Sequence, residues 1–231
     1  MDQSVLDAVK RWPDVPVVYG WLSLTARGEW KLHPLGDAQL GGAGQGITNT
    51  QILGFIGRNY ASQEDGAWFF QNGPQRVYVR LDAAPLILHV DPSARAITTH
   101  NGITVQKISD WYCDETGQLF AHTDVGPGRV DDRDLHLVAD ILRSADGRSL
   151  FDWFALFEQA QEQALKENEN EVKMGSTRIL LADPDKQYAV LTEPAALRFI
   201  NAAEIPKALH FIPNPGPSLI NSDALGRKIM P

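Results

Sequence analysis

Short aromatic and β-branched runs, each closed by a turn, fill the first half of this chain. Residues 17–24 lead into residues 29–32 through an Arg-Gly turn, and residues 67–71 lead into residues 76–81 through an Asn-Gly-Pro loop. Runs of this length and period predict β-hairpins. Turn residues bound four further predicted strands, at residues 86–90, 96–99, 103–108 and 118–123.

Other segments carry apolar residues at helical spacing. The spacing predicts short helices at residues 4–11, 50–60, 132–143 and 194–203. Residues 149–168 give the clearest helical pattern, with a serine N-cap and an apolar stripe that includes Trp153, Phe154 and Phe157. The sequence therefore predicts an α+β fold: an antiparallel β-rich body of hairpins, several short helices and one long aromatic-faced C-terminal helix.

The β-rich pattern ends near residue 145. We expect a β-rich domain over residues 1–145 and a C-terminal part over residues 146–231 that packs on it. This C-terminal part would contain the long helix, a hairpin at residues 177–182 and 187–191, and an extended proline-rich tail. A single continuous domain is the alternative, because 231 residues can bury one sizeable core.

Glycine marks two further features. Residues 36–46 contain five glycines and few side chains that could anchor a core, so we expect a mobile surface loop. Residues 26–30, 64–68 and 115–119 share a turn pattern with a central glycine, followed by Trp or Leu. Their uneven spacing excludes a propeller or solenoid, so we interpret them as recurrent hairpin turns, with a duplicated β unit as the alternative.

The chain is acidic. It has 21 Lys and Arg residues against 29 Asp and Glu residues, a formal net charge of −8 and a pI near 5.2. The positive residues are scattered singly, whereas proteins that track phosphates usually present a clustered basic face. The charge pattern therefore argues against nucleic-acid binding.

No apolar run in the sequence reaches the ~18 residues that a membrane span needs, and no run of signal-peptide length precedes Trp12. The single cysteine, Cys113, cannot form an intramolecular disulfide. We therefore expect a cytoplasmic protein without membrane insertion. Cys113 is expected to be buried and inert, since free cysteine is among the most buried residue types.

Several motifs spread over most of the chain carry a family resemblance. They include Trp-Leu-Ser-Leu-Thr-Ala-Arg-Gly-Glu-Trp-Lys-Leu at residues 21–32, Phe-Ile-Gly-Arg-Asn-Tyr at residues 55–60 and the aromatic block at residues 66–79, with further matches at residues 99–102, 114–117, 131–134 and 193–200. In these motifs the chain resembles a proteobacterial family of unknown function. More faintly, its order of elements is similar to another uncharacterised bacterial family of β-rich proteins. The resemblance implies a bacterial, soluble, β-rich protein and supplies no catalytic residue.

Polar side chains gather around the second predicted helix and the hairpin after it. Arginines and amides near a hairpin mouth could recognise a carboxylate or phosphate by bidentate donation, or capture an acidic partner protein. The alternative is structural: Arg58 and Arg76 would pair with Asp65 and Asp82 and tie the helix to the sheet. The candidate ligand-binding residues are Arg58, Asn59, Gln71, Asn72, Gln75 and Arg76.

A second candidate group combines imidazoles and carboxylates between residues 122 and 136, with His100 as a further member. These ligand types could hold a divalent ion that activates a water for hydrolysis. The same acids also suit the start of a helix, with Asp131 or Asp132 as the N-cap, so a structural explanation needs no metal. The metal ligands in this alternative are His122, Asp124, Asp132, Asp134 and His136.

Motifs of two common enzyme classes are missing from the sequence. Residues 36–46 lack the Lys-Ser/Thr end of a phosphate-binding loop, and the chain has no Gly-x-Ser-x-Gly elbow. We therefore expect no cofactor and favour a non-enzymatic binding module for a small anionic ligand or a partner protein. The metal-assisted hydrolase is the alternative, and a homodimer through a sheet edge or the aromatic stripe is a candidate assembly.

Overall fold

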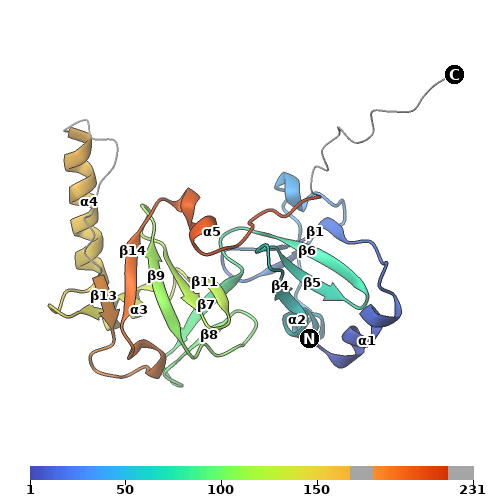
Figure 1. Ribbon diagram of the computed structural model, residues 1–231, viewed down its shortest axis with the longest axis horizontal. Coiled ribbons are helices and arrows are strands. Elements are labelled where there is room, and N and C mark those ends of the chain that lie inside the picture. Colours follow the sequence, from blue (N-terminus) through green and yellow to red (C-terminus); the bar gives the residue numbers. More distant parts are fainter. Residues whose placement is uncertain (167–178, 218–231) are drawn as a thin grey trace.

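Two β-sheets lie side by side and form the body of the molecule (Figure 1). The computed structural model describes residues 1–166 and 179–217. The first sheet has the strand order β3-β2-β1-β6-β5-β4, and the second has the order β12-β13-β14-β9-β10-β11-β7-β8. Helices flank both sheets, so the fold is α+β, as predicted.

The strands of the first sheet come from one continuous part of the chain: β1 (Val18–Leu24), β2 (Trp30–Leu32), β3 (Gln45–Gly46), β4 (Tyr60–Ser62), β5 (Trp68–Asn72) and β6 (Gln75–Leu81). The second sheet contains β7 (Leu86–Asp91), β8 (Ala96–Thr99), β9 (Ile108–Cys113), β10 (Leu119–Thr123), β11 (Gly126–Val130), β12 (Arg143–Ser144), β13 (Ile179–Ala182) and β14 (Ala195–Phe199). The α-helices are α1 (Gln3–Arg11), α2 (Thr50–Arg58), α3 (Leu135–Ile141), α4 (Leu150–Lys166) and α5 (Ile205–Ala208), and short 3-10 helices lie at Ala38–Leu40, Ala189–Leu191 and Ala202–Glu204.

The predicted antiparallel body is observed only in part, because both sheets also contain parallel strand pairs: β1 with β6 in the first, and β9 with β14 and β7 with β11 in the second. Leu22 of β1 lies opposite Val79 of β6, and Trp111 of β9 lies opposite Leu197 of β14, in parallel register. Parallel neighbours need a long crossover connection, which helices usually provide. The chain supplies one through α2 in the first sheet, and one through α3 and α4 in the second.

The two sheets share one strand arrangement. In each, a hairpin is followed by a third antiparallel strand, a helix and three further strands, of which the last pairs in parallel with the first. Thus β1 to β6 correspond to β9, β10, β11, β12, β13 and β14, while β7 and β8 extend the second sheet beyond this shared pattern. The topology therefore favours the duplicated unit that the sequence analysis held as an alternative.

The predicted hairpin turns are observed, and they share their hydrogen bonds. The amides of Thr25, Gln63 and Asp114 each bond the carbonyl four residues later, at 2.8–3.1 Å. The glycine of each turn donates its amide back to the same residue and has a positive φ of 79–88°. Only glycine adopts this backbone without strain, so the turn chemistry that the sequence displays three times has a direct structural cause.

Three predicted elements at the second sheet are wrong. The hairpin strand predicted at residues 187–191 is not formed, because Ala189–Leu191 are a 3-10 helix and β13 pairs with β12 and β14 instead. Residues 194–203 were expected to be helical, but Ala195–Phe199 form β14, which lies between β9 and β13. A parallel strand covered on both faces is a continuous apolar run, and such a run resembles a helix in sequence. The strand predicted at residues 103–108 is also displaced, because β9 begins only at Ile108.

The helix α4 stands at the β13 end of the second sheet (Figure 1). A reciprocal capping box starts it, with the Ser149 amide donating to Asp152 Oδ2 at 2.7 Å and the Asp152 amide donating to Ser149 Oγ at 3.2 Å. Phe157 is buried and stacks on Phe199 of β14, with the ring centroids 4.5 Å apart. The strands β13 and β14 follow α4, so it is not a C-terminal helix. The end of its predicted range, 167–168, lies outside the described residues.

The chain returns to the first sheet after α5 (Figure 1). The Leu81 amide donates to the Pro213 carbonyl at 2.7 Å, and the Ile212 amide donates to the Gly66 carbonyl at 3.0 Å. One apolar core of buried side chains is shared by both sheets.

The domain boundary at residue 145 stays a prediction. Within residues 1–166 and 179–217, no helix combines the length and apolarity that crossing a bilayer requires.

The glycine-rich segment 36–46 is anchored, although the sequence analysis expected few anchoring residues. Its Ala38 is completely buried in a 3-10 turn, and Gln45–Gly46 form β3. Beneath the segment, His33 is completely buried. His33 Nε2 lies 2.8 Å from Ser23 Oγ, and its Nδ1 lies 3.2 Å from Asp37 Oδ1. A buried imidazole thus fixes this loop to β1.

Candidate functional site

Strand geometry divides the predicted Arg/Asn/Gln set. Successive side chains of a strand point to opposite faces, and β5 and β6 are paired so that Gln71 faces Arg76 while Asn72 faces Gln75. The Arg76 guanidinium lies 4.0 Å above the Phe69 ring, and its Nε lies 3.5 Å from Gln71 Oε1. The hairpin therefore carries two cross-strand pairs, one on each face of the first sheet.

The other two members of the set lie at the end of α2 and contact the N-terminus. Asn59 is completely buried: its Oδ1 accepts the Asp2 amide at 2.8 Å, and its Nδ2 donates to the Phe55 carbonyl at 2.9 Å. Arg58 Nε donates to Asp2 Oδ1 at 3.1 Å. The predicted ion pairs of Arg58 and Arg76 with Asp65 and Asp82 are wrong, because Arg58 pairs with Asp2 and Asp82 pairs with Arg80, while Arg76 contacts Phe69 and Gln71.

A pocket of about 460 Å³ opens on the face of the first sheet that carries Asn72 and Gln75. Among the residues that the structure describes, neither of these amides has a hydrogen-bond partner for its side chain. We call this cavity the sheet pocket. Apolar side chains from β1, β2, α2, β5, β6 and the loop before α2 form the rest of its wall: Val18, Trp21, Leu22, Leu32, Ile47, Ile52, Ile56, Phe70 and Val77.

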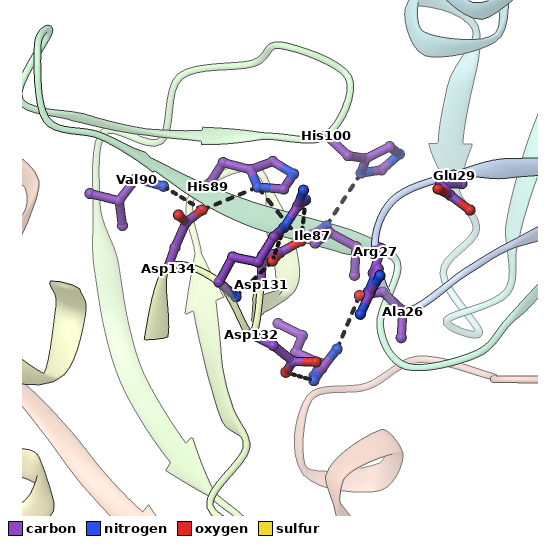
Figure 2. Close-up of polar contacts among 12 residues, drawn as sticks. Ala26, Arg27, Glu29, Ile87, His89, Val90, His100, Asp131, Asp132 and Asp134 are labelled. Atoms are coloured by element: carbon purple, nitrogen blue, oxygen red, sulfur yellow. Dashed lines mark hydrogen bonds and ion pairs between the residues drawn. The ribbon is translucent and has the colours of Figure 1, made fainter. Parts of the chain in front are cut away.

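A second constellation lies where β7 and β11 run in parallel (Figure 2). His89 is on β7, and Asp131 follows the last residue of β11, with its amide bonded to the Leu88 carbonyl at 2.9 Å. Asp134 stands at the start of α3. One donor atom from each of the three residues lies within 4.8 Å of the others. We call this group the His89 cluster.

The contacts inside the His89 cluster are polar and close. His89 Nδ1 lies 3.2 Å from Asp134 Oδ2 and 3.9 Å from Asp131 Oδ2. The Val90 amide also donates to Asp134 Oδ2, at 3.2 Å (Figure 2). The Asp131 carboxylate is buried and accepts Arg133 Nε and Nη2, both at 2.9 Å. These hydrogen bonds lower the pKa of Asp131 to about 2.

The predicted metal set is not brought together. Asp134 belongs to the His89 cluster, but Asp132 pairs with Arg129, and Asp124 Oδ1 accepts the amides of Gln106 and Lys107. His122 is an exposed side chain of β10 that contacts Ser109 on the neighbouring strand β9. His136 is an exposed side chain of α3. His100 accepts the Ile87 amide at Nδ1, and burial lowers its pKa to about 3.

His89 and Asp131 belong to the His89 cluster but not to the predicted metal ligands, and the sequence indicates their proximity only indirectly. Asp131 stands within the acidic run at residues 131–134, whereas His89 follows Leu86-Ile87-Leu88 and has the sequence context of an ordinary strand residue. Only the parallel pairing of β7 with β11 puts the two together. The carboxyl ends of adjacent parallel strands lie at the same end of a sheet, so a His and an Asp at those strand ends indicate that the two side chains lie close together.

Ser23, His33 and Asp37 have the order of a catalytic triad. Ser23 and His33 are both completely buried, and a Cβ on Gly44 would come within 2.8 Å of the imidazole. A nucleophile needs access to its substrate, and this hydroxyl has none. We assign the chain of hydrogen bonds to loop anchoring.

Cys113 is expected to be unreactive in the native protein. Its side chain is buried, and this burial raises the pKa of the thiol to about 12, which leaves little of the reactive thiolate at neutral pH. Modification by Ellman's reagent at pH 8 should be at least about a hundredfold slower for native than for guanidinium-unfolded protein. Rapid native modification would show that the structure around β9 opens to solvent, and it would restore Cys113 as a candidate nucleophile.

The fold and the two sites define an α+β protein with two sheets that share a six-strand pattern, an apolar pocket on one sheet and a polar cluster on the other. Over residues 1–215 the chain matches the family DUF2944, described as a protein of unknown function (DUF2946), and it belongs to this family. The resemblance to a family of unknown function is therefore confirmed. No curated protein matches the chain.

Two solved structures of DUF1285 family proteins are similar to this chain. The one from Silicibacter pomeroyi DSS-3 is 18% identical, with a TM-score of 0.43 over 61% of this chain and 79% of the other. The one from Shewanella baltica OS155 is 13% identical, with a TM-score of 0.37 over 52% of this chain and 91% of the other.

Proposed function

We propose that this protein is a non-enzymatic binding module whose sheet pocket takes a small molecule with an apolar body and a carboxylate end. The observation that carries the proposal is the pairing of two unpartnered amides, Asn72 and Gln75, with nine apolar side chains around one cavity. Ligand sites are typically about 300–1,000 Å³, mostly apolar, with a few polar groups that fix orientation. The sheet pocket has this composition and size.

The chemistry of the amides favours an acceptor group on the ligand. Each amide NH2 offers two hydrogens, and a carboxylate offers acceptor-only oxygens. Hydrogen bonds to a charged group are worth about 1.5–3 kcal/mol, so two amides can orient a carboxylate without an arginine. The proposal therefore keeps the anionic ligand expected from the sequence but places it at Asn72 and Gln75, not at the arginines.

We expect the variant Ile52→Glu to weaken binding of a fluorescent fatty acid, cis-parinaric acid, by at least about tenfold. Ile52 lines the sheet pocket from α2 and is 49% exposed, so the substitution adds a charge to the pocket at little cost to folding. Gln51→Glu is the matched control, because the same charge then stands one residue earlier on the helix. Fluorescence titration measures both.

The amides are tested separately. Asn72→Ala should weaken displacement of the probe by dodecanoate about tenfold, through loss of a charge-assisted hydrogen bond. Arg76→Ala, on the opposite face of the same hairpin, should leave displacement unchanged. Weakening by Arg76→Ala without weakening by Ile52→Glu would move the binding site to the other face and overturn the proposal.

The remaining expectations complete the proposal. We infer that the protein is located in the bacterial cytoplasm, from the family resemblance and the single cysteine. A partner protein and a homodimer stay predictions, which size-exclusion chromatography with light scattering can test.

A further inference from the structure

We propose that the His89 cluster is a binding site for a divalent transition-metal ion, with His89 Nδ1, Asp131 Oδ2 and Asp134 Oδ2 as the three protein ligands. The site lies on the second sheet and involves no residue of the sheet pocket, so it stands independently of the proposed function. Its ligands also differ from the set expected from the sequence, with Asp134 as the shared member.

The donor atoms are already close enough to share an ion. Metal–ligand bonds of about 2.0–2.2 Å separate neighbouring ligand atoms by about 3 Å. The 3.2 Å and 3.9 Å separations from His89 Nδ1 to the two carboxylate oxygens therefore need only small side-chain shifts. On binding, the ion would take the place of the Nδ1 hydrogen that now faces Asp134.

The surroundings of the cluster hold its ligands in place. The guanidinium and the backbone amide of Arg133 donate hydrogen bonds to the Asp131 carboxylate. These bonds fix the plane of the carboxylate, as hydrogen bonds to metal-ligating carboxylates commonly do. Asp131 Oδ2 has two lone pairs, so it can accept Arg133 Nη2 and still bind a cation.

An ion can reach the cluster from solvent. The side chains of His89 and Asp134 are 29% and 20% exposed, while that of Asp131 is 1% exposed. Two ligands therefore border solvent and one forms the floor of the site. Three protein ligands leave at least one coordination position for water, as in zinc sites with three protein ligands and one bound water.

The ligand set selects the class of metal. Imidazole suits zinc, iron, copper and nickel, whereas carboxylates suit manganese, magnesium and calcium. One imidazole with two carboxylates favours ions that accept both ligand types, and Zn²⁺ and Mn²⁺ are the two we would test. Mg²⁺ and Ca²⁺ prefer oxygen ligands alone, so they should bind at least about tenfold more weakly.

The experiment is isothermal titration of the full chain with Zn²⁺ alone and with Mn²⁺ alone, after treatment with a chelator. We expect saturable binding of one ion per chain, and at least a tenfold loss of affinity in His89→Gln and in Asp134→Asn. His122→Gln is the matched control, because it removes an exposed imidazole elsewhere on the same sheet, and it should bind like wild type.

Several outcomes would overturn the proposal. They are the absence of saturable binding, equal affinity of His89→Gln and wild type, or loss of affinity in His122→Gln alone. Circular dichroism establishes that each variant is folded before titration. Because Mn²⁺ is paramagnetic, it should also broaden the His89 imidazole resonances, and broadening confined to other histidines would place the ion elsewhere. A failed metal titration would not contradict the proposed ligand site in the sheet pocket, and a failed fatty-acid titration would not contradict the metal site.

Discussion

Replacing His33 with alanine is expected to lower the free energy of unfolding by about 3 kcal/mol, one of the two largest effects we predict. The substitution removes a completely buried imidazole from between Ser23 and Asp37. It leaves the Ser23 hydroxyl buried without its partner and opens a cavity under the glycine-rich segment 36–46. Both consequences destabilise the folded state in the same direction.

Urea unfolding followed by tryptophan fluorescence measures this change, and hydrogen exchange of residues 36–46 locates it. His122→Ala is the control, because His122 is exposed and should change stability by no more than about 0.5 kcal/mol. Equal unfolding midpoints for the two variants would mean that His33 does not anchor the loop.

Arg129→Met is expected to cost about 2–3 kcal/mol and to weaken the connection between the two sheets. Arg129 lies on β11 and is 5% exposed. It donates to the Ala26 carbonyl of the first sheet at 3.0 Å, and to Gln118 and Asp132 of the second sheet. Methionine keeps most of the buried aliphatic contact but makes none of these bonds, which leaves the Ala26 carbonyl without this donor.

The readout is again urea unfolding, with circular dichroism and fluorescence recorded together. A lower midpoint is expected, and loss of coincidence between the two signals would report that the sheets unfold separately. Arg198→Met is the matched control, since Arg198 pairs with Asp110 at an exposed position and should cost less than about 1 kcal/mol. A similar loss in both variants would remove the special role of Arg129.

Local chemistry in the sequence predicts the hairpin turns, but not the order in which strands join. The glycine turns at Gly28, Gly66 and Gly117 have the expected backbone because φ is positive at each. The strand β11 escaped prediction, since Gly126-Pro127-Gly128 has the composition of a turn. The structure explains both glycines: a Cβ at Gly128 would come within 2.8 Å of Leu88 on the adjacent strand, and Gly126 has a positive φ of 126° beside Trp68.

The sequence also predicts only those parts of the candidate sites whose residues are close together along the chain. Asn72 and Gln75 belong to the predicted set because they lie within one hairpin, where sequence distance and spatial distance agree. The sequence does not indicate that Gln71 and Arg76 would occupy the opposite face, since a one-residue change in register exchanges the faces. His89 and Asp131 meet only through strand pairing between distant segments.

The hairpin β7–β8 adds two strands, including the one that carries His89, to the second sheet, and the first sheet has no equivalent of it. It joins the two matching units along the chain, and it pairs with the outer edge of β11. His89 therefore comes from the connecting hairpin, whereas Asp131 and Asp134 follow the third strand of the shared pattern. The strand pattern that the two sheets share provides no position beside β3 equivalent to that of His89, because β3 is the last strand of its sheet.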